Sequence, residues 1–322
     1  MKAIELLWLL QARCNYECPY CDYNDDRGGG RQALIKMDKS YPVAAWAAAW
    51  RRFFEKNGRA SVYISGSGEP TLYHDFTGLL KEITRYHYVI FDTNLYWSVA
   101  ALSRFVAEIP PQHVRVETSF HPHTAKIEEF AAKAEILRDH GFIYNCRMVA
   151  HPELFGRIDE FRAYFESQGL RFVLTPFTGT HAGRVYPRDY TPEERAKIMN
   201  VAHLRSGDVQ RSKEPELIQH LVDQHIDSPE GRLCSSGLLY GCIMPDGTVY
   251  RCQDYGMRGW DPLGNFLDEE FRLAPAPSLC RSKECGIAYR YLVDQAERFG
   301  HAPIEGTSNA ETTDAGQSSA KR

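Results

Sequence analysis

The sequence predicts an α/β fold in which a partial (β/α)6 barrel is followed by a small cysteine-rich module made of a β-hairpin and a helix. Residues 4–175 alternate six short β-like runs with amphipathic helical runs, which is typical of parallel strands joined by helical crossovers. The fourth and fifth runs have one polar face. Strands covered by helices on both sides are apolar throughout, so a barrel with a polar interior is favoured over a doubly wound sheet. The cysteine-rich module is indicated by five of the nine cysteines, which lie after residue 232.

The boundaries of the barrel elements follow from hydrophobic periodicity and from residues that start and stop helices. Strands are expected at residues 4–10, 61–65, 89–93, 114–118, 142–149 and 171–175. Helices are expected at residues 40–58, 75–86, 98–108, 125–140 and 159–168. Thr124 is the expected cap of the fourth helix, and Gly58, Gly141 and Gly169 are the expected stops.

The pattern changes after the sixth strand. Residues 178–190 are expected to form a loop, and Thr191 with Glu194 forms a capping box that opens a further helix. We expect domain boundaries at 1–206 for the barrel, 207–231 for a linker and 232–299 for the cysteine-rich module, with 288–299 as a closing helix. Residues 300–322 are expected to be a disordered tail, because they contain almost no large apolar side chain.

Composition excludes several classes of protein. The chain has 322 residues, 43% hydrophobic and 25% charged, and a formal net charge of −4. That charge indicates neither a nucleic acid nor an anionic membrane as partner. The apolar run at 4–10 is too short to span a bilayer and lacks the features of a signal peptide. A cytoplasmic location is therefore expected, where reduced cysteines act as metal ligands or core residues rather than disulfides.

The first cysteine cluster follows the first strand directly. Cys14, Cys18 and Cys21 have three and two residues between them, so their thiolates can converge from one loop. Soft thiolate ligands select zinc or iron–sulfur clusters. Structural zinc needs four ligands, so a zinc knuckle requires a fourth ligand from elsewhere, whereas three thiolates on a four-iron cluster leave one iron open.

The Cys-x3-Cys-x2-Cys spacing after the first strand of a β/α barrel resembles the signature of the radical S-adenosylmethionine (radical SAM) superfamily. The resemblance implies a [4Fe–4S] cluster on Cys14, Cys18 and Cys21, with SAM bound to the fourth iron. It also implies that Tyr20 packs near the adenine of SAM. The cofactor then carries the difficult chemistry and the protein positions it. A flavodoxin- or ferredoxin-type protein is the implied electron donor.

A second segment, Gly66-Ser67-Gly68-Glu69-Pro70, follows the second strand. Glycines allow close approach of a ligand to the backbone, although a bare Gly-x-Gly also forms ordinary tight turns. The segment resembles the superfamily's Gly-Gly-Glu-Pro segment, which binds the amino group of SAM, and departs from it at Ser67. The resemblance further implies cofactor contacts at three later strand ends, namely Asn94, Glu117 and Ser119.

Three other residues near the strand ends have two interpretations each. Arg147 is expected to point into the barrel, where it contacts SAM or substrate, or forms a salt bridge with Glu117. His121 belongs to the same polar group at the end of the fourth strand, or hydrogen-bonds within its own loop. Cys146 lies on the apolar side of the fifth strand, so a core position is expected.

A second cysteine cluster is expected in the C-terminal module. Pro245-Asp246-Gly247 between β-favouring residues predicts a hairpin that carries Cys252 back toward Cys234, and Cys280 with Cys285 forms a second close pair. Four thiolates bind zinc or an iron–sulfur cluster. The segment from Gly247 to Cys252 resembles the twitch form of the SPASM extension found on some radical SAM enzymes. The resemblance implies one auxiliary cluster, [4Fe–4S] or [2Fe–2S], on Cys234, Cys252, Cys280 and Cys285.

One auxiliary cluster is the arrangement of aminocyclitol dehydrogenases such as 2-deoxy-scyllo-inosamine dehydrogenase, which the chain resembles. The resemblance implies oxidation of a polyol or amino-sugar, with Asp254 and Arg147 as candidate substrate contacts. The alternative is modification of a small peptide. Cys242 is then a candidate hydrogen-atom donor, and otherwise a core residue or a replacement cluster ligand. A zinc-binding regulatory module without catalysis is the alternative from another class.

Overall fold

A computed structural model of the chain describes residues 4–21, 23, 30–65, 67–202, 228–283, 285 and 290–295. The longer strands are β1 (Ile4–Trp8), β2 (Ala60–Ile64), β3 (Tyr88–Thr93), β4 (Val114–Ser119), β5 (Ile143–Ala150), β6 (Phe172–Pro176) and β10 (Tyr240–Ile243). The shorter strands are β7 (Gly179–His181), β8 (Arg184–Tyr186), β9 (Leu233–Cys234), β11 (Thr248–Tyr250), β12 (Gly264–Asn265) and β13 (Ser278–Leu279). The α-helices are α1 (Gly30–Met37), α2 (Val43–Asn57), α3 (Phe76–Ile83), α4 (Val99–Glu108), α5 (Ile127–Asp139), α6 (Ile158–Ser167), α7 (Pro192–Ala202) and α9 (Gln253–Arg258).

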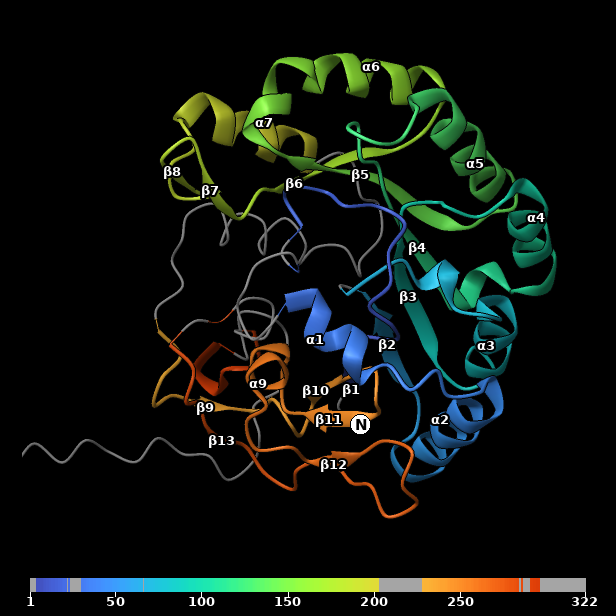
Figure 1. The fold of residues 1–322 in the computed structure, drawn as a ribbon, viewed down its shortest axis with the longest axis vertical. Helices are drawn as coiled ribbons and strands as arrows, with labels where there is room; N and C mark the ends of the chain where they lie inside the picture. Colours follow the sequence, from blue (N-terminus) through green and yellow to red (C-terminus); the bar gives the residue numbers. More distant parts are fainter. Residues whose placement is uncertain are drawn as a thin grey trace, which may run out of the picture.

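The strands β1 to β6 form a partial barrel. They lie side by side in chain order, and each pairs in parallel with the next. The sheet curves, and helices α2 to α6 follow its outer side (Figure 1). This arrangement confirms the predicted partial barrel, and it brings the carboxyl ends of the strands, where such barrels carry their chemistry, to one rim.

The C-terminal hairpin extends this sheet. Strand β10 pairs in parallel with β1, with Leu7 beside Cys242, and β11 and β12 continue the sheet beyond it. The predicted hairpin is confirmed, because β10 and β11 are antiparallel on either side of Pro245-Asp246-Gly247. The cysteine-rich segment is thus continuous with the barrel sheet.

Alternate residues of β1 face two different cores. Trp8 packs on the outer side against Trp46 and Trp50 of α2, with ring centroids 4.6 and 5.4 Å apart. Leu7 belongs to a second core, which also contains Leu34 of α1 and residues of the cysteine-rich segment. Because successive side chains of a strand point to opposite faces, β1 holds the outer helices and the inner segment together.

Two local predictions are wrong. The predicted loop at 178–190 contains the hairpin β7–β8, in which Ala182 and Gly183 both have positive φ, as two-residue hairpin turns require. Helix α5 begins at Ile127 with Lys126 as its cap, because Thr124 lies in a turn closed by its N–H on the carbonyl oxygen of His121.

Other local predictions are confirmed. Thr191 and Glu194 form the predicted capping box at the start of α7, with reciprocal bonds of 2.7 and 3.2 Å. Helix α1, in contrast, was not predicted. Only Gly30 and Leu34 of its eight residues are buried, so its sequence offers only a narrow buried face.

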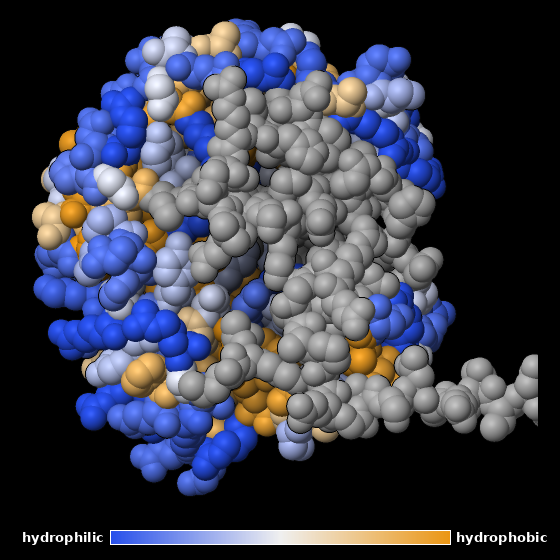
Figure 2. Space-filling view, turned by 180° about the vertical axis from the view of Figure 1, so that it is seen from behind, coloured by the Kyte–Doolittle hydropathy of each residue, from blue (hydrophilic) through white to orange (hydrophobic). Residues whose placement is uncertain are grey.

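Several predicted segments lie wholly or partly outside the described residues. These are most of the 207–231 linker, half of the predicted 288–299 helix, of which residues 293–295 form a 3-10 turn, and the 300–322 tail. None of the described helices combines the length and apolarity that a membrane crossing needs. Outside the grey residues, the face in Figure 2 is mainly hydrophilic with scattered hydrophobic patches.

Candidate active site

The first cysteine cluster lies in the loop after β1, at the rim of the barrel. Cys14, Cys18 and Cys21 form no disulfide among the described residues, and the backbone N–H of Cys21 donates to the carbonyl oxygen of Cys18 at 3.1 Å. Burial, followed by the nearby thiols of Cys21 and Cys14, raises the pKa of Cys18 to about 11. The three thiols belong to one short loop, and this soft donor set fits an iron–sulfur cluster.

Arg31 of α1 lies against this loop. Its Nη2 donates to Sγ of Cys21 at 2.9 Å, and its Nη1 donates to the carbonyl oxygen of Tyr16 at 3.3 Å. A guanidinium beside a thiol stabilises the thiolate form, which is the form that binds metal. Arg31 was not predicted, because no spacing rule connects it to the cysteines.

His121 connects the cysteine loop to the end of β4. Its Nδ1 lies 3.0 Å from Oη of Tyr20 and 3.4 Å from Sγ of Cys18. The predicted bond within its own loop is wrong for the side chain, whose partners come from the loop after β1. Burial, then His123, lowers the pKa of His121 to about 4, so its imidazole is neutral at pH 7.

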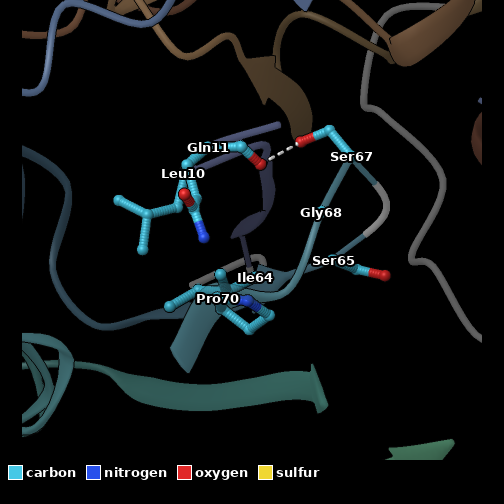
Figure 3. Close-up of a pocket in the computed structure, with 7 residues that line it drawn as sticks. All are labelled: Leu10, Gln11, Ile64, Ser65, Ser67, Gly68 and Pro70. Atoms are coloured by element: carbon cyan, nitrogen blue, oxygen red, sulfur yellow. Dashed lines mark hydrogen bonds between the residues drawn. The ribbon is translucent and has the colours of Figure 1, made fainter. Parts of the chain in front are cut away.

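The Ser67-Gly68-Glu69 segment packs directly on the chain that leads into the cysteine loop. Oγ of Ser67 donates to the carbonyl oxygen of Gln11 at 2.6 Å, as Figure 3 shows, and Nε2 of Gln11 donates to the carbonyl oxygen of Glu69. The backbone N–H of Glu69 donates to the carbonyl oxygen of Arg13 at 2.9 Å. The cysteine loop and the glycine-containing segment, predicted as separate motifs, are thus joined by hydrogen bonds. Gly66, the first residue of the predicted glycine-containing segment, lies outside the described residues.

Gly68 is required by this packing. A Cβ atom there would lie 2.7 Å from the carbonyl carbon of Ala12, 2.9 Å from that of Arg13 and closer still to the Arg13 carbonyl oxygen. These are backbone atoms that cannot rotate away. Glycine therefore allows the close approach of the two loops.

The carboxylate of Glu69 is buried and hydrogen-bonded. Its Oε1 accepts from Oγ1 of Thr71 at 2.5 Å and from Oγ1 of Thr93 at 2.7 Å, and its Oε2 accepts from the backbone N–H of Asn94 at 2.7 Å. Burial raises the pKa of Glu69, and these hydrogen bonds oppose that shift. Glu69 therefore holds the ends of β2 and β3 together.

Asn94 and Asn15 carry polar atoms that fit a bound ligand. Nδ2 of Asn94 donates to Oδ1 of Asn15 at 2.9 Å and lies 4.0 Å from Sγ of Cys14. Oδ1 of Asn94 and Nδ2 of Asn15 are buried and have no hydrogen-bond partner among the described residues. Because buried polar groups are normally paired, the acceptor Oδ1 of Asn94 fits the amino group of SAM beside the cysteine loop, and the donor Nδ2 of Asn15 fits its carboxylate.

Charged side chains fill the barrel interior below this rim. Nη2 of Arg147 lies 2.9 Å from Oε2 of Glu117, and its Nη1 lies 3.3 Å from Oδ1 of Asp92. Arg115 also pairs with Glu117, and Oη of Tyr63 donates to Asp92 at 2.9 Å. The salt-bridge interpretation of Arg147 is confirmed. Ser119 lies beside Arg147 in the register of β4 and β5, and Cys146 is a fully buried core residue as expected.

We expect Arg147→Met to lower the free energy of unfolding by about 2 kcal/mol, since buried Glu117 keeps Arg115 but loses one of its two cations, and Asp92 loses its ion pair with Arg147. Only 2% of the Glu117 side chain is exposed. Urea denaturation under anaerobic conditions measures this change. Arg51→Met is the matched control, because Arg51 pairs with Glu55 on the surface and should change stability little. Equal effects of the two variants would contradict the structural role of Arg147.

The second cysteine cluster is formed by β9, the start of α9 and the segment after β13. Burial raises the pKa of Cys252 to about 12, and Cys234 and Cys280 are among the groups that raise it further. Burial raises the pKa of Cys285 above its ordinary range, and the thiols of Cys252, Cys234 and Cys280 raise it further. Cys234 and Cys252 lie in one buried core group, and Cys280 and Cys285 pack against it, so the four predicted ligands share one region of the structure.

Arg251 holds this second cluster in place from a buried position. Its guanidinium donates to Oγ of Ser278 at 2.6 Å and to the carbonyl oxygens of Cys234 at 3.1 Å and Leu279 at 3.0 Å. Arg251 thereby links β9 to the segment that carries Cys280. It was not predicted, and its position directly before Cys252 is the only signal that the sequence offers.

The structure also shows what surrounds two further predicted residues, Cys242 and Asp254. The thiol of Cys242 is fully buried 3.9 Å from Sδ of Met244, which favours a core role over that of a hydrogen donor to substrate. Asp254 lies in the first turn of α9, and its Oδ1 pairs with Nε of Arg258 at 3.0 Å.

Comparisons with known proteins agree with this architecture. A model of the radical SAM superfamily matches residues 8–165. No curated protein matches the chain. Among solved structures, the chain is similar to anSMEcpe with bound AdoMet, with 18% identity and a TM-score of 0.55 over 83% of this chain and 78% of that chain.

Two further solved structures are more distant. SuiB from Streptococcus suis, bound to its precursor peptide SuiA, has 15% identity and a TM-score of 0.53. The match covers 84% of this chain but only 64% of SuiB, less than two thirds of its length. BtrN in complex with AdoMet and 2-DOIA has 12% identity over 83% of this chain and 79% of that chain, and its TM-score of 0.41 supports no inference.

The identities are low, so these structures bear on the fold alone. The family match includes the cysteine loop, the Gly68-Glu69 segment and the strand ends that carry Asn94 and Glu117. The superfamily implies a [4Fe–4S] cluster and SAM, and the described residues fit both. Residues 8–165 of this chain are therefore a domain of the radical SAM superfamily.

Proposed function

We propose that this protein is an enzyme that cleaves SAM reductively at a [4Fe–4S] cluster on Cys14, Cys18 and Cys21. The observation that carries the proposal is the joining of two motifs. The loop that carries the three cysteines is hydrogen-bonded to the Gly68-Glu69 segment. Oδ1 of Asn94 and Nδ2 of Asn15, which have no hydrogen-bond partner among the described residues, lie beside it. When bound, the cluster and SAM supply a 5′-deoxyadenosyl radical that takes a hydrogen atom from the substrate. Anaerobic formation of 5′-deoxyadenosine by the reconstituted protein tests this proposal.

The chain's own residues then have distinct roles. Arg31 stabilises the Cys21 thiolate as a cluster ligand, and Gly68 lets the SAM-binding segment approach the cluster loop. Tyr20, Glu117 and Ser119 complete the proposed cofactor site at the strand ends. A flavodoxin- or ferredoxin-type electron donor and a cytoplasmic location belong to the same proposal.

We further propose an auxiliary iron–sulfur cluster on Cys234, Cys252, Cys280 and Cys285, in a twitch-like module. The location of the four cysteines in and around one buried core group supports it. Thiolates bind soft metals, so the same four residues could also hold zinc. Iron analysis separates the two metals.

Cys285→Ala is expected to remove the auxiliary iron, about four atoms for [4Fe–4S] or about two for [2Fe–2S], while basal SAM cleavage continues at the first cluster. Iron content and Mössbauer spectra measure the loss. Cys242→Ala is the matched control, because its thiol is buried away in the core and should leave the iron content unchanged. If Cys242→Ala loses iron and Cys285→Ala does not, the proposed ligand set is wrong.

For the substrate we propose a polyol or amino-sugar that is oxidised at a carbinol carbon. This oxidation would remove one hydrogen atom, one electron and one proton from the carbinol group. The radical that SAM supplies would take the hydrogen atom, and a cluster held by Cys234, Cys252, Cys280 and Cys285 would accept the electron. Asp254 supports this proposal, because it lies two residues after Cys252, and its charge adds to the effect of burial in raising the pKa of Cys280. Carboxylates are suitable partners for hydroxyl and ammonium groups.

A peptide substrate is the second candidate. It is favoured by the two similar structures that contain peptides, SuiB with SuiA and anSMEcpe with the Cp18Cys peptide. Transfer of deuterium from labelled aminocyclitols or labelled peptides into 5′-deoxyadenosine decides between the two classes.

Asp254→Asn should lower turnover of the aminocyclitol at least about tenfold, which corresponds to about 1.4 kcal/mol, while basal SAM cleavage is retained. The measurement compares product formation with 5′-deoxyadenosine formed in the absence of substrate. Arg258→Gln serves as the control, since it removes the partner of Asp254 but keeps the carboxylate. Unchanged turnover in Asp254→Asn would remove Asp254 from the substrate site.

A further inference from the structure

A group of histidines lies at the rim of the barrel beside the cysteine loop. His123 follows β4, His151 and Glu153 follow β5, and His181 ends β7 of the hairpin. We call these four residues the rim cluster. None of them belongs to the cysteine motifs, and the proposed function assigns them no role.

Three members of the rim cluster have the geometry of a metal site. The ligand atoms of His123, His151 and Glu153 all lie within 4.8 Å of one another. In tetrahedral zinc sites with bonds of about 2.0–2.1 Å, ligand atoms are about 3.3 Å apart. Side-chain rotation of the exposed His123 and Glu153 is enough to close this difference, because both residues are at the surface.

His151 points independently to a missing ligand. Only 5% of it is exposed, and its Nδ1 has no hydrogen-bond partner among the described residues. The nearest carboxylate oxygen, Oε2 of Glu153, is 3.8 Å away, too far for a hydrogen bond. A buried polar atom without a partner costs about 1–3 kcal/mol, and a metal ion between the two side chains would satisfy it.

His181 supports Glu153 from the other side. Its Nε2 lies 3.9 Å from Oε1 of Glu153, and its ring is 4.8 Å from that of His151. This is ion-pair distance rather than hydrogen-bond distance, and outer partners of this kind commonly orient the carboxylate ligands of metals. The hairpin β7–β8 is what brings His181 to this position.

We propose that His123, His151 and Glu153 bind one divalent first-row metal ion, with zinc as the reference ion and His181 as a positioning residue. Two imidazoles and one carboxylate are a ligand set of catalytic zinc sites, which keep an open position for an oxygen ligand. The ring of Tyr20 is 5.5 Å from that of His151, so the ion lies next to the cysteine loop. The open position can therefore take a carboxylate or hydroxyl group of a molecule bound at the rim.

The test uses protein with fully loaded iron–sulfur clusters, so that the cysteines are occupied. Zinc is titrated anaerobically against a chromophoric chelator, and zinc-edge X-ray absorption identifies the ligand atoms. We expect one zinc ion per chain beyond the cluster metals, with nitrogen and oxygen ligands at about 2.0–2.1 Å and no sulfur at about 2.3 Å.

Substitutions of the proposed ligands test whether zinc binds at the rim cluster. His123→Ala and Glu153→Gln, both at exposed positions, should weaken zinc binding at least about 100-fold, and His181→Ala about 10-fold. His140→Ala is the matched control, because His140 precedes β5 at the opposite end of the barrel and should bind zinc like the wild type. Circular dichroism and iron content confirm that each variant is folded and loaded.

Three results would overturn the proposal. They are the absence of zinc binding by the wild type, sulfur in the coordination shell, and unchanged affinity in both His123→Ala and Glu153→Gln. Each result is independent of SAM cleavage, so a failure here is distinguishable from a failure of the proposed function.

Discussion

We expect the triple variant with alanine at Cys14, Cys18 and Cys21 to form no detectable 5′-deoxyadenosine from SAM and dithionite, whereas the wild-type protein forms it. The three thiols are the ligands that the loop after β1 offers to a cluster, and alanine offers none. Without the cluster no electron reaches SAM. The assay is anaerobic reconstitution with iron and sulfide, followed by chromatography of the nucleosides.

Cys146→Ala is the control for this experiment. Cys146 is fully buried in β5, so its loss should leave both the iron content and SAM cleavage intact. If the triple variant cleaves SAM as well as the wild type does, the proposed function fails. A wild-type protein with an assembled, reducible cluster but no product would instead require us to withdraw the claim of basal cleavage, and with it the proposed enzyme activity.

Gly68→Ala has the second large expected effect. The new Cβ would lie within 2.9 Å of three backbone atoms of Ala12 and Arg13, so the two loops must separate. Overpacking of this kind costs about 1–3 kcal/mol, and separation also breaks the bond between the Glu69 N–H and the Arg13 carbonyl oxygen. We expect SAM affinity of the cluster-loaded protein to fall at least about tenfold, since about 1.4 kcal/mol corresponds to that factor.

Equilibrium dialysis with labelled SAM measures this loss. Gly156→Ala is the matched control, because a Cβ at Gly156 meets no atom within 4 Å. It should bind SAM like the wild type. Wild-type affinity in Gly68→Ala would mean that the two loops do not approach each other as closely as the structure places them.

Much of the barrel could be predicted because its signals are local. Each of the strands β1 to β6 overlaps a predicted strand. Ser98 and Asp75 are N-caps of α4 and α3, and their side chains accept a backbone N–H bond, as these residue types commonly do. The cysteine spacing and the Gly68-Glu69 segment identified the superfamily for the same reason. A cluster-binding loop and a close backbone approach both need particular residues at particular intervals.

The contacts between distant segments could not be predicted. Cys18 and His121 are 103 positions apart in the chain, and nothing in either segment indicates that they meet. The pairing of β10 with β1 joins residues 240–243 to the first strand of the chain, although each strand alone has several possible partners. Arg31 and Arg251 were missed because a basic residue acquires its role from the sulfur or carbonyl group that it reaches.

The sequence by itself determined the alternation of strands and helices and the ligand spacing of the cysteine loop, because these depend on neighbouring residues. Only the tertiary structure decided that Gly68 packs on Ala12 and Arg13, that the C-terminal hairpin extends the barrel sheet, that Arg147 is paired with Glu117 and Asp92, and that the rim cluster assembles from three segments. The physical reason is that strand register and packing set these contacts, and both depend on the whole chain.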